Sequence, residues 1–158
     1  MAELRFGLGF DVHPRGDAPP LLLGGVRFED EMRLEGHSDA DVVCHSVADA
    51  LLGAAALGDL GTYFPDDDAS TAGMGGMDLL AKVVELIREG GLRPSSCDIV
   101  VVTELPAIAP RRDEMRANLS QALGVPIDRI SIKATRPEGM GLTGDGAACL
   151  ALAVATTS

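Results

Sequence analysis

Apolar residues recur along the chain with two different periods, which predict alternating strands and helices. Residues 4–12 alternate loosely and predict a strand that ends near His13. Residues 21–28 contain two apolar runs around Gly24-Gly25 and predict a hairpin. Three further strands are expected at 98–104, 127–134 and 147–155, with a helix as the alternative for the last segment.

Helical spacing predicts three helices between these strands. Residues 40–57 are rich in Ala, Leu and Val, with Ser38 as a candidate N-cap and Asp41 three residues further on. The other two helices are expected at 77–89, before Gly90-Gly91, and at 110–123, before Gly124. Residues 58–76 are dense in Gly, Asp, Ser and Pro, which predicts a long surface loop.

This order of elements predicts the fold class α/β (α+β), with one domain over residues 1–158 and a mixed sheet covered by helices. The chain has no Trp, 1 Tyr and 4 Phe, so Leu, Val, Ile and Ala must fill the core. A chain of 158 residues buries roughly 70% of its unfolded surface, so the core requires no disulfide or structural metal.

The charge of the chain limits its partners. Its 24 acidic and 13 basic residues give a formal net charge of −11. Such a chain repels nucleic-acid phosphates, and no basic run offsets this, so we expect no nucleic-acid partner. An acidic protein binds a diphosphate only with cations nearby, and divalent metal ions are the usual source.

Cysteine usage and hydropathy predict a cytoplasmic protein. Cys44, Cys97 and Cys149 are far apart and form no CxxC pair, as expected of reduced thiols in a cytosol. The first residues show no basic segment followed by an apolar one, so we expect no signal peptide. The longest apolar run, residues 147–156, is about half of the ~20 residues that span a membrane, so no membrane association is expected.

All three histidines lie in the first 45 residues, each beside carboxylates. Asp11 and His13 share one face of the first strand, because residues two apart in a strand point the same way. If the helix over 40–57 packs on that strand, His45 completes a set of two imidazoles and one carboxylate. That set suits a catalytic zinc ion with an open fourth position. Asp41, His45 and Asp49 would also form one stripe along the helix.

Simpler interpretations of the same residues stay open. His13 can be a polar residue at the end of a strand. His45 can be a partly buried histidine that hydrogen-bonds Asp41 or Asp49. Asp41 can do no more than cap the helix together with Ser38.

Two glycine-rich segments are further candidates. Residues 58–68 form a Gly/Asp loop that can bind hydroxyl groups and present backbone amides, or is simply a solvated acidic turn. Residues 133–144 contain Gly139, Gly141 and Gly144 as a GxGxxG pattern. A dinucleotide-binding fold needs a further helix and strand, and residues 145–158 are too few for both. What remains is a flexible loop suited to phosphate and a second metal ion.

Three segments together resemble one known family. GFDVH, GHSDADVVCHSVADALLGAAALGDLGTYFPDDD and KATRPEGMGLTGDG resemble the 2-C-methyl-D-erythritol 2,4-cyclodiphosphate synthase family, in order and spacing, over essentially the whole chain. The resemblance implies a phosphorus–oxygen lyase of the non-mevalonate isoprenoid pathway. It also implies a homotrimer of α/β subunits with active sites at the interfaces between neighbours.

The resemblance assigns roles to matching positions. It implies Zn²⁺ or another divalent cation at Asp11, His13 and His45, and Mg²⁺ or Mn²⁺ at Glu138 near the substrate diphosphate. The catalytic positions that it implies are His37, Thr135 and Arg136. The positions that it places against the substrate are Asp11, His13, His37, Ser38, Asp59, Gly61, Phe64, Asp66, Asp68, Thr103, Pro106, Ala107, Ile108, Ala109, Ala134, Thr135, Arg136, Glu138, Leu142 and Asp145.

Within that set, the resemblance implies a division of labour. Asp59 and Gly61 meet the ribose, and residues 103–109 form a cytosine pocket chiefly through their backbone. The 2-phosphate of 4-diphosphocytidyl-2-C-methyl-D-erythritol 2-phosphate then attacks the β-phosphorus of its own cytidine diphosphate end, and CMP leaves. No protein nucleophile is needed, so charge neutralisation and positioning should supply most of the rate enhancement.

The chain departs from the family pattern at several positions. Ala40 and Ala107 stand where the family usually has Gly and Lys, and Arg136 stands where it usually has a Thr that stabilises the transition state. An arginine binds phosphate more strongly than a hydroxyl, but with a different geometry. Asp145 and Ala147 replace an Arg and a Glu near a central apolar cavity that can hold an isoprenoid diphosphate. We therefore expect this chain to bind such an anion weakly or not at all.

Two other functions stay open. The first is a catalytically impaired, metal-binding trimer with a binding or regulatory role, which has lost turnover through Arg136 and Asp145. The second is a metal-dependent phosphohydrolase, although no general base is apparent beyond the metal ligands.

Overall fold

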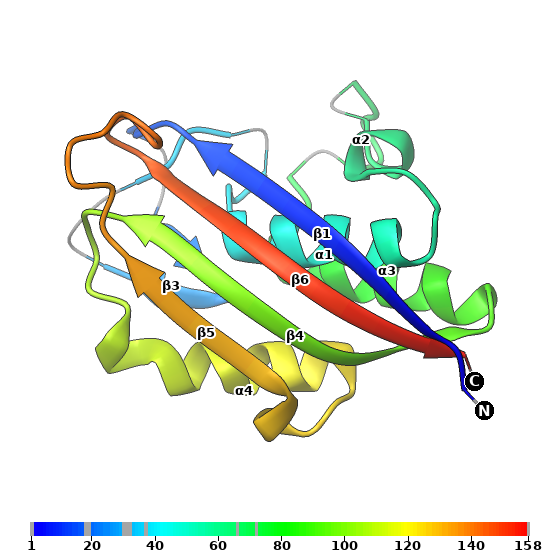
Figure 1. Cartoon of the computed structure of the whole chain (residues 1–158). Helices are drawn as coiled ribbons and strands as arrows, with labels where there is room; N and C mark the ends of the chain where they lie inside the picture. Colours follow the sequence, from blue (N-terminus) through cyan, green and yellow to red (C-terminus); the bar gives the residue numbers. More distant parts are fainter. Residues whose placement is uncertain are drawn as a thin grey trace.

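A four-stranded sheet forms the centre of the fold (Figure 1). The computed structural model describes residues 2–17, 20–29, 33–36, 38–65, 67–71 and 73–157. The strand order is β1-β6-β4-β5, and a separate hairpin pairs β2 with β3. The strands are β1 (Leu4–His13), β2 (Leu21–Leu23), β3 (Val26–Phe28), β4 (Leu92–Thr103), β5 (Ile130–Thr135) and β6 (Ala147–Thr157).

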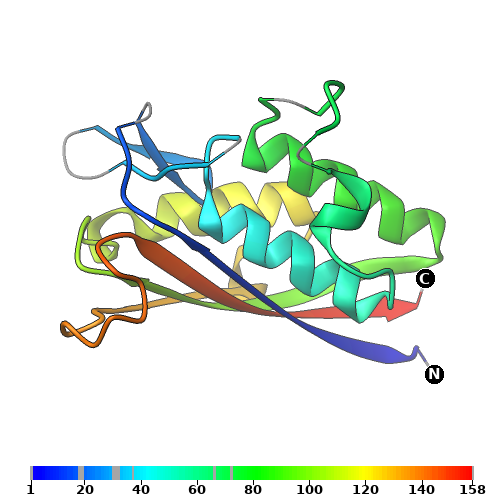
Figure 2. The same cartoon turned by 90° about the horizontal axis from the view of Figure 1, so that it is seen from above.

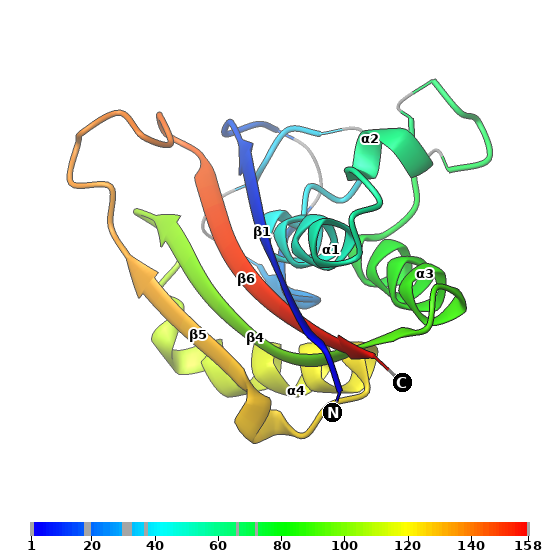
Figure 3. The ribbon, with the colours of Figure 1, turned by 45° about the vertical axis from the view of Figure 1, so that its right-hand side comes forward.

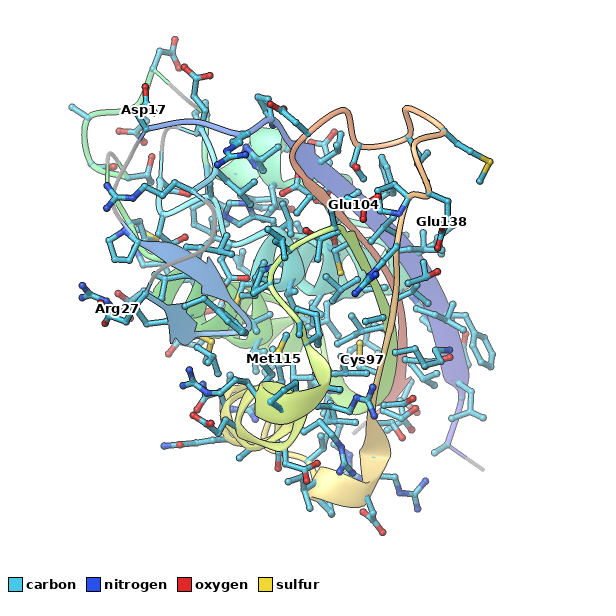
Figure 4. The ribbon with its side chains drawn as sticks, turned by 90° about the vertical axis from the view of Figure 1, so that its left-hand side faces the viewer. Asp17, Arg27, Cys97, Glu104, Met115 and Glu138 are labelled. Carbon is cyan, nitrogen blue, oxygen red and sulfur yellow. The ribbon has the colours of Figure 1, made fainter. Side chains whose placement is uncertain are left out.

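The helices cover one face of this sheet (Figure 2). They are α1 (Val42–Ala54), α2 (Leu60–Tyr63), α3 (Gly76–Glu89) and α4 (Arg112–Leu123), with short 3₁₀ turns at η1 (Ala109–Arg111) and η2 (Ile127–Arg129). Met115 of α4 and Cys97 of β4 both lie in the layer between helices and sheet (Figure 4). No helix in the described residues is long and apolar enough to cross a membrane.

Strand directions bring three strand ends together. β6 runs antiparallel to both β1 and β4, and β4 runs parallel to β5. β1, β4 and β5 therefore end at the same edge of the fold. There His13 pairs with Ala147, and Ala147 pairs with Thr103. The candidate site lies along this edge.

Two glycines of β1 let helix α1 approach the sheet closely. A Cβ atom on Gly7 would lie 1.9 Å from the backbone oxygen of Ala50, and one on Gly9 would lie 2.0 Å from that of Ser46. Neither position can carry a side chain unless the helix moves away. Since strand residues alternate, Asp11 continues the face that bears both glycines.

The opposite face of the sheet is open and apolar. β1 exposes Leu4, Phe6, Leu8, Phe10 and Val12, and neighbouring β6 exposes Leu150 and Leu152. Each of these residues has 39–65% of its surface accessible to solvent. A contiguous apolar surface of this kind is typical of an interface with another protein chain.

The predicted fold class is confirmed, and the element boundaries show instructive differences. The segment 147–155 is a strand, as first expected, and it lies inside the sheet. The strand expected at 98–104 begins earlier, at Leu92, and the loop expected at 58–76 contains the short helix α2. The expected strand at 127–134 begins with the 3₁₀ turn η2.

The expected helix cap at Ser38 is wrong, because Asp41 is the N-cap of α1. Its buried carboxylate accepts hydrogen bonds from the amides of Val43 and Cys44, and from those of Gly24 and Gly25 in the β2–β3 turn. Asp41 thus fixes the start of α1 against the hairpin.

Candidate functional site

Three side chains from two elements meet at the end of β1. Asp11 Oδ2 lies 3.1 Å from His13 Nε2 and 3.1 Å from His45 Nδ1, and donor atoms of all three residues lie within 4.8 Å of one another. Ligand atoms of a tetrahedral zinc site, with bonds of about 2.0–2.1 Å, are roughly 3.3 Å apart. The group therefore has the composition and nearly the spacing of a metal centre.

The hydrogen bonds around His13 favour a cation in this group. His13 Nδ1 lies 2.7 Å from the backbone oxygen of Glu35, which can only accept, so Nδ1 carries the proton. A neutral ring then presents a lone pair on Nε2, the atom that faces Asp11. Without a cation, contact with the carboxylate requires a protonated imidazolium. With a divalent cation, the neutral ring can donate from Nδ1 to Glu35 and bind the cation through the lone pair on Nε2. The hydrogen bond to Glu35 then fixes the orientation of the ring.

The ionisation of the group is consistent with this. Burial alone would raise the pKa of the Asp11 carboxyl, but hydrogen bonds from His13 and His45 outweigh it and hold that pKa far below its usual range. The hydrogen bond to Asp11 raises the pKa of His13, against a smaller opposing effect of burial. Asp11 is therefore an anion at neutral pH, as a metal ligand must be.

The stripe expected along α1 does not form. Asp41 points into the helix cap, and within the described residues no hydrogen bond joins the imidazole of His45 to the carboxylate of Asp41 or Asp49. His45 instead bonds Asp11, as the packing of α1 on β1 predicts. The second ring nitrogen, Nε2, lies 3.3 Å from Ser38 Oγ. The interpretation of His45 as a partner of Asp41 or Asp49 is therefore wrong.

A pocket of about 400 Å³ opens beside the three ligands. Ser38, Gly61 and Phe64 of the predicted substrate positions line it. Several apolar residues of the lining were not predicted from the sequence. Their position in the Gly/Asp loop or on α3 was the only feature that could have indicated them. The full lining is His13, Ser38, His45, Leu60, Gly61, Phe64, Pro65, Thr71, Met74 and Leu79.

Two other loop carboxylates are used within the loop. Asp59 is the N-cap of α2, where its Oδ1 accepts from Thr62 N at 3.1 Å and Thr62 Oγ1 at 2.9 Å. Asp68 accepts from Ser70 N at 2.8 Å. Neither lines the pocket. His37 and Asp66, also predicted substrate positions, lie outside the described residues.

The remaining predicted positions form a second group where β4 and β5 end. Thr103 is buried, with its hydroxyl bonded to the backbone oxygen of Leu105. Pro106 and Ile108 are buried after it, whereas Ala107 and Ala109 are exposed. The positions at the end of β5 and beyond are exposed: Ala134, Thr135, Arg136, Glu138, Leu142 and Asp145.

Glu138 has a backbone conformation that is rare for residues other than glycine. Its φ is +52°, in the left-handed region that side chains other than glycine rarely adopt. Figure 4 places Glu138 near Glu104, at the edge of the fold where β4 and β5 end.

The two groups are separated within one chain. β1 and β5 are opposite edges of the four-stranded sheet, about 14 Å apart at the usual strand spacing. Asp11 and His13 lie on the helix-covered face. Thr135 lies on the open face, because it alternates with the buried Ile130 and Ile132. One chain therefore does not bring these two groups onto one small molecule.

Comparison with known proteins gives consistent relatives. The chain is 51% identical over 149 residues to the 2-C-methyl-D-erythritol 2,4-cyclodiphosphate synthase of Symbiobacterium thermophilum, covering 94% of this chain and 95% of the relative. It is 50% identical over 149 residues to the bifunctional enzyme IspD/IspF of Desulforudis audaxviator. That match covers 94% of this chain but spans only 38% of the bifunctional relative.

Solved structures agree in fold. The bifunctional IspDF of Campylobacter jejuni matches with a TM-score of 0.93 and 38% identity, over 100% of this chain and 43% of that one. IspF of Plasmodium falciparum, solved as a CDP complex, matches with a TM-score of 0.84 and 28% identity, over 98% of this chain and 97% of that one. The family model of the YgbB family matches residues 4–158, and the chain therefore belongs to the YgbB family.

Proposed function

We propose that this chain converts 4-diphosphocytidyl-2-C-methyl-D-erythritol 2-phosphate into 2-C-methyl-D-erythritol 2,4-cyclodiphosphate with release of CMP, as a single-domain lyase of the non-mevalonate isoprenoid pathway. The observation that carries the proposal is the group of Asp11, His13 and His45 beside the pocket. The name shared by relatives of similar length supports the same reaction.

Two metal ions belong to the proposal. Zn²⁺ or another divalent cation would be held by Asp11, His13 and His45, and Mg²⁺ or Mn²⁺ by Glu138 with the substrate diphosphate. Bound cations neutralise phosphate charge and make phosphorus a better electrophile. In a chain of net charge −11, such neutralisation is needed before two phosphate groups can approach each other.

The chain's own residues supply position and shielding. Glu35 fixes the ring of His13, and Ser38 Oγ beside His45 can donate a hydrogen bond to a phosphate oxygen. Leu60 and Phe64 line the pocket with apolar surface, which excludes water from the reacting phosphates. The proposal assigns His37 to substrate binding, Thr135 and Arg136 to the transferring phosphate, and residues 103–109 to the cytosine.

A second copy of the chain is part of the proposal. Since the Asp11 group and Thr135 lie on opposite faces and edges of the sheet, an active site that uses both needs two chains. The open apolar face of β1 and β6 offers a surface for such contacts. The resemblance noted from the sequence supplies the number three, so we propose a homotrimer with active sites between subunits. We also propose a cytoplasmic location, supported by three free, buried cysteines.

The deciding experiment measures CMP release with added zinc and magnesium. We expect release by the wild type, loss in His45→Ala, and retention in Asp113→Ala, which removes an exposed carboxylate that pairs with Arg116 on the same helix. Circular dichroism would show that each variant is folded, and metal content would show whether His45→Ala has lost the ion.

Other outcomes would favour other functions. A folded, metal-loaded wild type that releases no CMP would favour the impaired binding protein, and Arg136→Thr would be the first reversion. Release of inorganic phosphate in place of CMP would favour a phosphohydrolase.

A further inference from the structure

The loop over the pocket is attached at both ends to the segment that carries His45. We define the pocket loop as residues 58–75; it includes α2 and runs to the start of α3 (Figure 3). Described residues of this loop provide much of the pocket wall, namely Leu60, Gly61, Phe64, Pro65, Thr71 and Met74. The position of the loop therefore decides the shape of the pocket.

Asp49 holds the start of the loop. It lies on α1, one turn after His45, and its Oδ1 accepts a hydrogen bond from Leu60 N at 2.8 Å. The side chain is half-buried and is not among the residues that line the pocket. Asp49 thus ties the first pocket residue of the loop to the helix of a metal ligand.

Asp39 holds the end of the loop. Its Oδ2 accepts from Gly76 N at 2.8 Å, at the first residue of α3. The N-cap of α3 is Gly75, which has no side chain to cap the helix, so Asp39 supplies the missing acceptor. Its other oxygen accepts from Asp41 N at 3.2 Å, which fixes Asp39 at the start of α1.

Within the described residues, these two bonds are the hydrogen-bonded ties of the loop to α1 and the segment before it. The other loop bonds are local: Phe64 N donates to Leu60 O, Thr71 N to Asp68 O, and Met74 N to Thr71 O. Apolar packing of Leu60 and Phe64 against the core also stabilises the loop, but it is non-directional and does not fix the position of the loop along α1.

We propose that Asp39 and Asp49 are positioning residues that set the pocket loop against the metal centre, so that ligand affinity depends on two side chains outside the pocket. The ligand in this inference, a cytidine diphosphate, rests on the proposed function. Asp49 accepts one backbone amide through one oxygen, so an asparagine oxygen can replace it, whereas an alanine cannot. Asp39 uses both oxygens, one for Gly76 N and one for Asp41 N, so an asparagine cannot keep both bonds.

The test compares Asp39→Ala and Asp49→Ala with Asp49→Asn and the distant control Asp113→Ala. Three properties are measured for each: amide hydrogen exchange of the loop ends, metal content, and affinity for CDP by calorimetry. We expect faster exchange near Leu60 in Asp49→Ala and near Gly76 in Asp39→Ala. CDP affinity should fall about three- to tenfold for each, as expected for loss of one hydrogen bond.

The controls separate positioning from other effects. Metal content should stay at the wild-type level in all variants, and Asp49→Asn and Asp113→Ala should bind CDP within about twofold of wild type. Loss of metal in the alanine variants would overturn the inference, since the aspartates would then act on the ligands. Unchanged exchange or unchanged CDP affinity in the alanine variants, or Asp49→Asn as weak as Asp49→Ala, would overturn it too.

The outcome for the proposed function is read separately. A wild type that binds CDP but releases no CMP would contradict the proposed reaction and leave the inference to be judged on exchange and affinity. A wild type without measurable CDP affinity would overturn the inference, because its ligand would be wrong.

Discussion

The contact between Gly9 and helix α1 predicts a large effect of one methyl group on a metal site. In Gly9→Ala the new Cβ would lie 2.0 Å from the backbone oxygen of Ser46. An ordinary approach of carbon to oxygen is about 3.3 Å, so α1 must move away from β1 by about 1.3 Å. His45 precedes Ser46 on that helix and moves with it, whereas Asp11 stays on β1.

The consequence is larger for metal binding than for stability. Overpacking of this kind costs about 1–3 kcal/mol, equivalent to roughly 2–12 °C in Tm for a chain of this size. Metal sites tolerate ligand displacements of only about 0.2 Å, so a shift of about 1.3 Å between Asp11 and His45 should weaken zinc binding at least about tenfold. Zinc affinity would be measured by competition with a chromophoric chelator, and Tm by calorimetry on metal-free protein.

Gly53→Ala is the matched control. Its Cβ would meet nothing closer than Gly7 Cα at 3.7 Å, an ordinary contact, although it lies on the same helix. Alanine also favours a helix interior over glycine by up to about 1 kcal/mol, so this variant should be as stable as wild type or more so, with unchanged zinc affinity. Wild-type Tm and zinc affinity in Gly9→Ala would refute the role we assign to the close contact.

Four further outcomes are expected. Asp41→Ala removes the acceptor of four backbone amides and should lower the free energy of unfolding by more than about 3 kcal/mol in urea titrations. Burial raises the pKa of Cys97 to about 12, so its thiol is protonated at pH 8 and should react with Ellman's reagent only after unfolding. Phe10→Glu charges the open sheet face and should shift the proposed trimer to monomers in sedimentation. Isoprenoid diphosphate titration should show weak or no saturable binding, which Asp145→Arg should increase. A wild-type urea midpoint in Asp41→Ala, or reaction of Cys97 in the native protein, would contradict the first two predictions. An unchanged mass of Phe10→Glu in sedimentation, or tight binding of isoprenoid diphosphate by the wild type, would contradict the other two.

Sequence periodicity was sufficient to predict most of the strands and helices. The loose alternation from Leu4 onward predicted a strand that carries Asp11 and His13 on one face, and β1 does so. His45 joins them because the apolar helix packs on that strand, which an amphipathic pattern indicates only in general terms. The partners of His45 were predicted only on the condition that this helix packs on the first strand, since carboxylates one turn away on the helix compete with Asp11 on the strand.

Contacts between distant segments were beyond the sequence pattern. Glycine ordinarily weakens a strand, so Gly7 and Gly9 do not look favourable in the sequence alone. The structure explains them, because α1 packs so closely on both positions that a side chain is excluded. The sequence indicated Asp49 as a member of a helical stripe. Its carboxylate instead accepts a hydrogen bond from the amide of Leu60, which the chain brings back to α1 only after a turn. The separation of Thr135 from the metal ligands follows from strand order, which the alternation of elements does not specify.

The place of β6 has a consequence for how the molecule folds. β6 is the last element in chain order, yet it lies between β1 and β4. Before residues 147–157 leave the ribosome, β1 has no neighbouring strand in the described sheet, and the strand bearing Asp11 and His13 is held by α1 and by the hydrogen bond of His13 to Glu35. Pairing of the first and last strands gives a high contact order, which slows folding. The residues of the candidate metal site are thus translated before β6, and their geometry is completed only after β6 has emerged.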